Sequence, residues 1–259
     1  IAFDRTCNFA CSYCNPAFST TWARDIKQKG PYTDMTTDGR NHFTHSHESA
    51  EPYKKDETNP YVEAFYTWWE TDLHKSLDEL RITGGEPMMS PNLWRLLDWI
   101  ETQGDKMNPN MTLAINSNLG AKQDIIDKFK QKLKNFDNFH LYTSNESTFG
   151  QAEYIRDGLN YNQWHDNMFS MMKENIPSEI HNMATINALC LETLPQFLEN
   201  LVQLKTASKL YGPSLNFTLN ILRFPSFQSP LVLPDDLRNL FKTNLEKFLL
   251  NNEKYLEHM

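Results

Sequence analysis

Apolar residues recur along most of the chain with the spacing typical of helices or of strands. Short apolar runs predict strands at residues 1–3, 80–83, 111–115, 139–143, 183–189 and 215–222. Apolar residues three or four positions apart predict helices at residues 62–77, 91–104, 123–133, around 168–172, 194–204 and 237–249. About six strands therefore alternate with helices, which predicts an α/β fold built of repeated βα units around a parallel sheet.

Punctuating residues refine these predictions. Ser90 followed by Pro91 is typical of a helix start, and Gly104 stands where a C-terminal cap is expected. Residues 19–58 are polar, contain turn signals and have no apolar period, so we expect an inserted loop there. Periodicity alone does not separate a barrel from a doubly wound sheet.

Composition narrows the class of protein. The chain has 259 residues, 39% hydrophobic and 22% charged, which excludes a disordered or collagen-like protein. Its 25 Lys and Arg against 33 Asp and Glu give a net charge of −8, so we expect no general nucleic-acid binding and no membrane attraction. Four cysteines favour a reducing, cytoplasmic location. The chain starts at Ile1 rather than Met, and we expect it to be part of a longer protein.

Three of the cysteines stand close together in the run CNFACSYC, as Cys7, Cys11 and Cys14. A short loop can bring three thiolates to three irons of a cubane cluster and leave the fourth iron open to a ligand. Tyr13 lies between two of these cysteines, where its ring could pack on a bound base. A zinc knuckle or a chance cluster is the alternative interpretation.

Polar segments follow the predicted strands, and the carboxyl ends of parallel strands meet at one edge of a sheet. The second strand is followed by Gly84-Gly85-Glu86-Pro87. Two glycines let the backbone approach a ligand closely, and the Glu86 carboxylate suits an ammonium group. The same run could also be an ordinary turn that precedes a helix.

The cysteine run and GGEP together resemble the two signatures of the radical SAM superfamily. The particular residues, CN…CSYC with RITGGEP, are most similar to the peptide- and protein-modifying branch of that superfamily, which includes enzymes with SPASM or twitch domains. The resemblance implies a partial (β/α)6, TIM-barrel-like core over residues 1–225. Residues 226–259 would then be a helical extension that begins a truncated region.

The resemblance also implies a chemistry. The three cysteines of the run would hold a [4Fe-4S] cluster, and S-adenosylmethionine would bind its open iron and be cleaved to a 5′-deoxyadenosyl radical. The residues that would contact the bound cofactor are Tyr13, Gly84, Gly85, Glu86, Ser117, Asn118, Ser144 and Arg156. An electron donor such as flavodoxin or ferredoxin and a peptide or protein substrate are the implied partners.

The sequence differs from that branch in one respect, and this weakens the inference of a peptide substrate. SPASM and twitch domains bind auxiliary clusters through further cysteines, but here only Cys190 follows the motif, and we expect it to be a buried residue of a strand. Two other hypotheses therefore stay open: a non-catalytic iron–sulfur or zinc protein, and a radical SAM enzyme that acts on a small molecule or nucleoside.

Overall fold

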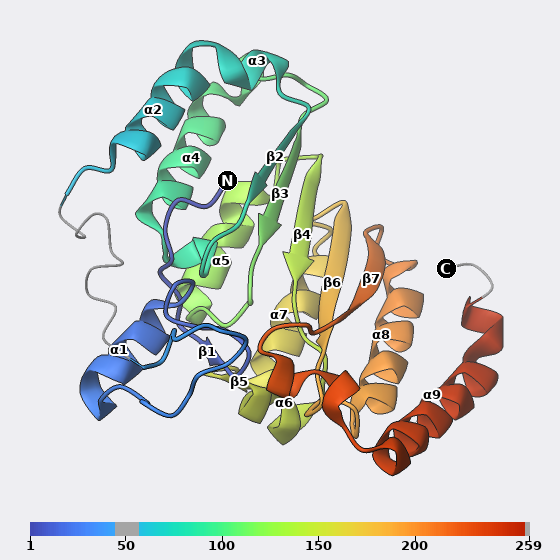
Figure 1. Ribbon diagram of the computed structural model, residues 1–259. Coiled ribbons are helices and arrows are strands. Elements are labelled where there is room, and N and C mark those ends of the chain that lie inside the picture. The colour runs from blue at the N-terminus through green and yellow to red at the C-terminus, as the bar shows by residue number, and fades with distance from the viewer. Residues whose placement is uncertain (45–56, 257–259) are drawn as a thin grey trace.

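The computed structural model describes residues 1–44 and 57–256, with side chains through residue 253. Within these residues the main sheet has five parallel strands in the order β2-β3-β4-β6-β7. These strands are β2 (Glu79–Ile82), β3 (Thr112–Asn116), β4 (Phe139–Thr143), β6 (Glu179–Ile186) and β7 (Ser214–Ile221). The arrowheads of β3 and β4 point downward in Figure 1, toward the level of β1 (Ala10–Cys11), which belongs to the cysteine loop.

Helices pack against one face of this sheet and leave the other face without a helical layer (Figure 1). They are α4 (Pro91–Gln103), α5 (Gln123–Leu133), α7 (Tyr161–Lys173) and α8 (Leu194–Ser208). Strand β6 shows why these residues form such a layer: every second residue from Ile180 to Ile186 is buried, while its neighbours are half-buried. One face of the strand therefore contacts helices, and the other carries mostly polar side chains.

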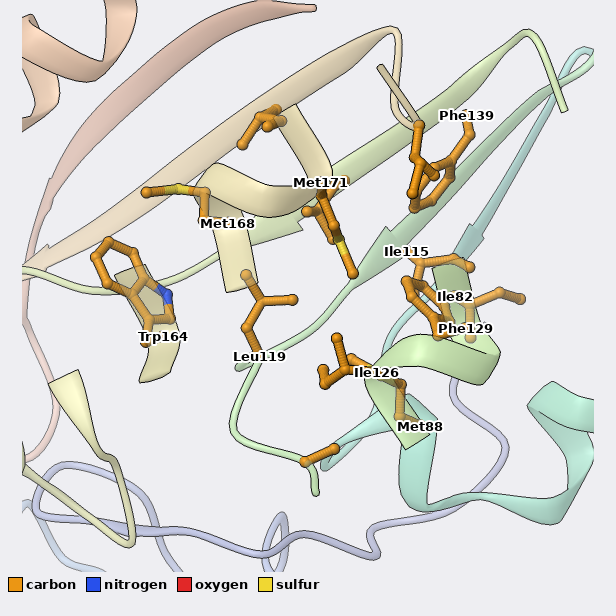
Figure 2. Close-up of a cluster of buried hydrophobic side chains, with 14 of the residues drawn as sticks. Ile82, Met88, Ile115, Leu119, Ile126, Phe129, Phe139, Trp164, Met168 and Met171 are labelled. Atoms are coloured by element: carbon orange, nitrogen blue, oxygen red, sulfur yellow. The ribbon is translucent and has the colours of Figure 1, made fainter. Parts of the chain in front are cut away.

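The hydrophobic core lies between the sheet and these helices. Its side chains come from the helix-facing positions of the strands and from the apolar stripes of the helices (Figure 2). Labelled members are Ile82, Met88, Ile115, Leu119, Ile126, Phe129, Phe139, Trp164, Met168 and Met171. All ten are at most 1% exposed, so the carboxyl edge of the sheet rests on a fully packed layer.

The remaining elements surround this layer. A two-stranded antiparallel ribbon joins β1 to β5 at the carboxyl edge, and α1 and α6 lie beside it (Figure 1). The segment before β2 is α2, a π-helical turn over Trp69–Leu73, and α3. The bounds of these elements are β1 Ala10–Cys11, β5 Arg156–Asp157, α1 Thr20–Lys29, α2 Pro60–Trp68, α3 His74–Ser76, α6 Phe149–Ile155 and α9 Asp235–Leu256.

The α/β class is confirmed, and several elements match their predicted ranges. The helix at residues 123–133 and the strand at 139–143 have the predicted bounds, and α4 begins at Pro91 after Ser90. The strand predicted at 183–189 runs instead from Glu179 to Ile186. It ends there because the Asn187 side chain accepts hydrogen bonds from the backbone N–H groups of Leu189 and Cys190, which form a turn.

Other predictions were wrong. Residues 1–3 form only an isolated bridge, between Ala2 and Thr83, rather than a first strand. The expected loop at 19–58 contains the ten-residue helix α1, capped by Ser19, while residues 45–56 lie outside the described part. By contrast, Gly104 is the C-cap of α4 as predicted, although its φ of −61° is right-handed and the chain continues into a 3₁₀ turn. Cys190 is buried as expected but lies in a turn rather than in a strand.

Residues 226–259, the expected extension, begin with two short 3₁₀ turns and continue into α9. Leu233, Phe241 and Leu245 pack against the core from this segment. Among the described residues, no helix is long and apolar enough to cross a membrane.

Candidate active site

The cysteine loop lies at the carboxyl edge of the sheet, and its three thiols are half-buried and free. Burial is the main reason why the pKa of Cys7 rises to about 11 and that of Cys11 to about 12. Burial also raises the pKa of Cys14. The thiols are close enough to interact electrostatically, since Cys11 interacts with both Cys7 and Cys14. Without a metal these thiols stay protonated at neutral pH.

The two glycines of the GGEP loop lie directly against the residues that lead into the cysteine loop. A Cβ on Gly85 would lie 2.4 Å from the carbonyl oxygen of Thr6, and one on Gly84 would lie 2.6 Å from that of Asp4. The Glu86 N–H donates to the Thr6 oxygen at 2.7 Å. Only glycine permits this approach, so the glycines join the two signature loops through backbone contact.

The Glu86 carboxylate is fully buried and accepts three hydrogen bonds from within the chain. Donors are the Met88 N–H at 3.1 Å, the Ser117 hydroxyl at 2.9 Å and the Asn118 N–H at 2.6 Å. Burial raises the pKa of Glu86 to about 7 despite these three donors. The predicted cofactor contacts after β2 and after β3 are therefore one connected network.

A second link ties Asn118 to the cysteine loop. Its amide donates to the Asn8 side chain at 2.9 Å and approaches the Cys7 sulfur at 4.0 Å. Phe9 is 1% exposed and fills the space in front of two glycines: a Cβ would meet its ring at 2.3 Å from Gly120 and at 2.9 Å from Gly158. Two residues of the motif that are not cysteines, Asn8 and Phe9, therefore help to hold the loop in place.

Arg156 and Glu146 form a second buried network. The Arg156 guanidinium donates from Nη2 to Glu146 Oε2 at 2.6 Å and from Nη1 to the Ser144 hydroxyl at 3.2 Å. The Tyr13 hydroxyl donates to the same carboxylate at 3.1 Å. Side chains of the ion pair are only 6% and 0% exposed. Burial is the largest influence and lowers the pKa of Arg156, but Glu146, Tyr13 and Cys11 together raise it above its usual value, so the guanidinium stays charged.

The β1–β5 ribbon places this network beside the thiols. Cys11 is the register partner of Arg156, and the Ser12 N–H donates to the Ile155 oxygen at 2.7 Å. The Arg156 charge opposes the rise in the pKa of Cys11 that burial causes. The structure thus brings Tyr13, Ser144 and Arg156 together on one side of the loop, while Glu86, Ser117 and Asn118 meet on the other.

Three neighbouring thiols are a donor set that could serve an iron–sulfur cluster or a single metal ion. No group of three His, Cys, Asp or Glu side chains in the described ranges is arranged to hold one metal ion. One zinc with Zn–S bonds of about 2.3 Å would draw three sulfurs to within about 4 Å of each other. In a cubane each thiolate binds its own iron, so neighbouring rather than convergent thiols suit it.

Comparisons with known proteins place this geometry in a known fold. No protein-family model and no curated protein matches the sequence. Streptococcus suis SuiB, solved alone and bound to S-adenosylmethionine, is similar over 96% of this chain and 46% of its own, with a TM-score of 0.54 and 11% identity. A structure of anSMEcpe with bound AdoMet is similar over 96% of this chain and 60% of its own, with a TM-score of 0.51 and 13% identity.

Both neighbours have been solved with bound S-adenosylmethionine, and the likeness shows that this chain has their fold. The resemblance drawn from the two signature loops is therefore confirmed at the level of the fold. The chain spans less than two thirds of the length of either neighbour.

Sequence reasoning did not single out the side chains that hold the cysteine loop. Glu146 and Asn8 are ordinary polar residues in sequence, and Phe9 looks like a spacer between cysteines. The available signal was that Gly120 and Gly158 stand as isolated glycines between predicted elements, which can mark a close approach of another segment. Nothing in the sequence indicates that this segment is Phe9.

Proposed function

We propose that this chain is the core of a radical SAM enzyme, which cleaves S-adenosylmethionine at a [4Fe-4S] cluster. The observation that carries the proposal is the direct backbone contact between the two signature loops, at 2.7 Å from the Glu86 N–H to the Thr6 oxygen. A protein that only stored a cluster would have no need for a buried carboxylate network locked to the cysteine loop.

Cys7, Cys11 and Cys14 would hold the cluster, which would supply one electron to S-adenosylmethionine and so yield methionine and a 5′-deoxyadenosyl radical. The role of the surrounding residues is to position both groups. Asn8 and Asn118 orient the loop near the Cys7 sulfur, and the buried core beneath them excludes water from that side.

The methionine part of the cofactor would bind beside Gly84, Gly85 and Glu86. A carboxylate has about four acceptor positions, and three of those on Glu86 are occupied. The fourth could accept from an ammonium, which would lower the raised pKa of Glu86 and keep it charged. Ser117 and Asn118 lie on the same network.

The cofactor carboxylate would bind near Ser144 and Arg156, with the Tyr13 ring beside them. Arg156 already pairs with Glu146, but a guanidinium has five donors and can share them between two carboxylates. In this arrangement Glu146 is the residue that holds Arg156 in place.

For the substrate we propose an extended peptide on the open face of the sheet. Tyr142 on β4 and His181 on β6 are register partners there, with stacked rings 5.3 Å apart, and Arg81 lies 4.1 Å over the Tyr142 ring. Flat aromatic and cationic groups on a polar surface are suited to peptide side chains and carbonyls. The SuiB structure bound to the precursor peptide SuiA is similar to this chain, with a TM-score of 0.54.

The test is anaerobic reconstitution with iron and sulfide, followed by dithionite and S-adenosylmethionine. We expect about four irons per chain and formation of 5′-deoxyadenosine, measured by mass spectrometry. Cys11→Ala should give neither, while Cys190→Ala, which changes a cysteine outside the loop, should give both. A cluster that leaves S-adenosylmethionine intact would support the electron-transfer alternative, and uptake of zinc alone would support the structural-metal alternative.

Two further reactions test the substrate and the electron donor separately. Candidate peptides are added to the reconstituted chain, and we expect a peptide substrate to increase 5′-deoxyadenosine formation and to lose this effect in Tyr142→Ala. A nucleoside that gives the same increase would contradict the peptide assignment. Reduced flavodoxin or ferredoxin replaces dithionite in a parallel reaction, because one of these is the expected electron donor.

A further inference from the structure

The start of helix α1 contacts the backbone of the cysteine loop through side chains that lie in the segment expected to be a loop. Ser19 is fully buried, and its hydroxyl donates to the carbonyl oxygen of Phe9 at 2.6 Å. The Ser19 hydroxyl oxygen in turn accepts from the Trp22 N–H at 3.3 Å and so caps the helix. One hydroxyl therefore connects the start of α1 to the middle of the cysteine loop.

The next two residues hold Cys7. The Thr21 hydroxyl donates to the Cys7 carbonyl oxygen at 2.7 Å. The Thr20 hydroxyl accepts from the Cys7 N–H at 3.1 Å and also approaches the Cys7 oxygen at 3.3 Å. Both backbone groups of the first cysteine are thus bound by side chains of α1.

The fourth residue holds Cys11. The Trp22 indole N–H donates to the Cys11 carbonyl oxygen at 2.9 Å. Its ring packs edge-on against Phe43, at 5.1 Å between centroids, which fixes the direction of the indole N–H. Four consecutive side chains, from Ser19 to Trp22, therefore bind the backbone of three loop residues.

We propose that residues 19–22 are a brace that sets the cysteine loop in the conformation needed to bind its cluster; the inference rests on the proposed function. An eight-residue loop with little regular pairing would otherwise have to be ordered by the metal itself, at the expense of affinity. The hydrogen bonds from residues 19–22 order the loop beforehand. Only residues 15–18, which form a turn, separate Cys14 from Ser19, so the connection is short. Residues 19–22 are positioning residues and do not touch the reacting atoms.

Three variants and one control test the brace. Thr21→Val removes the hydroxyl at nearly constant shape, Thr21→Ser keeps it, and Trp22→Phe removes the indole donor while an aromatic ring remains. The control is Thr67→Val, because the Thr67 hydroxyl also donates to a backbone oxygen, that of Glu63 at 2.9 Å, but on α2. Each protein is reconstituted with ferrous iron and sulfide, and iron release to a chelator is timed.

We expect Thr21→Val and Trp22→Phe to release iron about three- to tenfold faster than the wild type, the effect of one lost hydrogen bond. Thr21→Ser should restore the wild-type rate, and Thr67→Val should stay within about twofold of it. The EPR spectrum of the reduced cluster should shift in the two variants that lose a donor. A role limited to general stability would lower the thermal midpoint without changing the spectrum.

The outcomes separate this inference from the proposed function. Equal iron release and equal spectra in wild type, Thr21→Val and Trp22→Phe would overturn the brace, even if S-adenosylmethionine is cleaved. A wild-type chain that binds a four-iron cluster without cleaving S-adenosylmethionine would overturn the proposed function and leave the brace intact. A wild-type chain that takes up no iron would overturn both.

Discussion

Replacing Gly85 by alanine tests the contact that joins the two signature loops. The added Cβ would lie 2.4 Å from the Thr6 oxygen, 2.6 Å from the Arg5 oxygen and 2.7 Å from the Arg5 carbonyl carbon. All three are backbone atoms, so no flexible side chain can move aside. Either the residues before Cys7 or the GGEP loop must shift.

Overpacking of a well-packed site costs typically 1–3 kcal/mol, and three backbone contacts place Gly85→Ala at the upper end, at about 3 kcal/mol. For a chain of this size that corresponds to a decrease of about 6 to 12 °C in the thermal midpoint. The shift would also break the hydrogen bond from the Glu86 N–H to the Thr6 oxygen and displace Cys7, so we expect iron uptake to fall as well.

The assay is thermal unfolding by circular dichroism, with iron per chain measured after reconstitution. Gly150→Ala is the matched control, because nothing lies within 4 Å of a Cβ at that position in helix α6. We expect the control to keep its thermal midpoint or to gain slightly from alanine's higher helix propensity. A Gly85→Ala protein with the midpoint and iron content of the control would refute the close-approach reasoning.

Three further predictions concern charged and sulfur groups of the site. Cys11→Ala should abolish uptake of a four-iron cluster, while Cys190→Ala should retain it, as iron and sulfide analysis will show; a brown, fully loaded Cys11→Ala protein would contradict the ligand assignment. The pKa of Glu86 is raised to about 7, so this carboxyl ionises at a lower pH in the unfolded chain than in the folded one. The metal-free chain should therefore lose about 3 kcal/mol of its free energy of unfolding as the pH rises from about 4.5 to 7. Urea unfolding at several pH values should therefore show a smaller decrease over this range in Glu86→Gln, and equal slopes would argue against a buried, raised carboxyl. Glu146→Gln should lower the free energy of unfolding by about 3 to 5 kcal/mol, because it leaves the buried Arg156 charge uncompensated, and urea unfolding at pH 7 measures the loss; a change below about 1 kcal/mol would mean that solvent reaches the pair.

Sequence periodicity predicted the elements best where a strict local pattern determines them. The strand at 139–143 alternates buried and half-buried residues without interruption, and the helix at 123–133 keeps its apolar stripe to its last residue, Leu133. Prediction was less accurate at the end of β6, where the Asn187 side chain rather than hydrophobicity ends the strand. It was also wrong for α1, because only one residue of that helix, Ile26, is buried and an apolar period is therefore missing.

The residues of the candidate site also fall into two groups, those that the sequence identified and those that only the structure showed. Cys7 and Gly84 were singled out from the sequence because each belongs to a short motif, and Arg156 because of the family resemblance. The partners of these residues were not identified, because Glu146 and Trp22 carry no local signal of what they contact.

By itself the sequence determined the α/β class, the order of most elements and the edge of the sheet at which the signature loops lie. These properties follow from patterns among residues near each other in the chain and from a general rule about parallel sheets. Tertiary structure alone decided that the glycines face residues 4–6, that Arg156 pairs with Glu146 opposite Cys11, and that α1 holds the cysteine loop. Such contacts depend on how separate elements pack in three dimensions, and no local period encodes that.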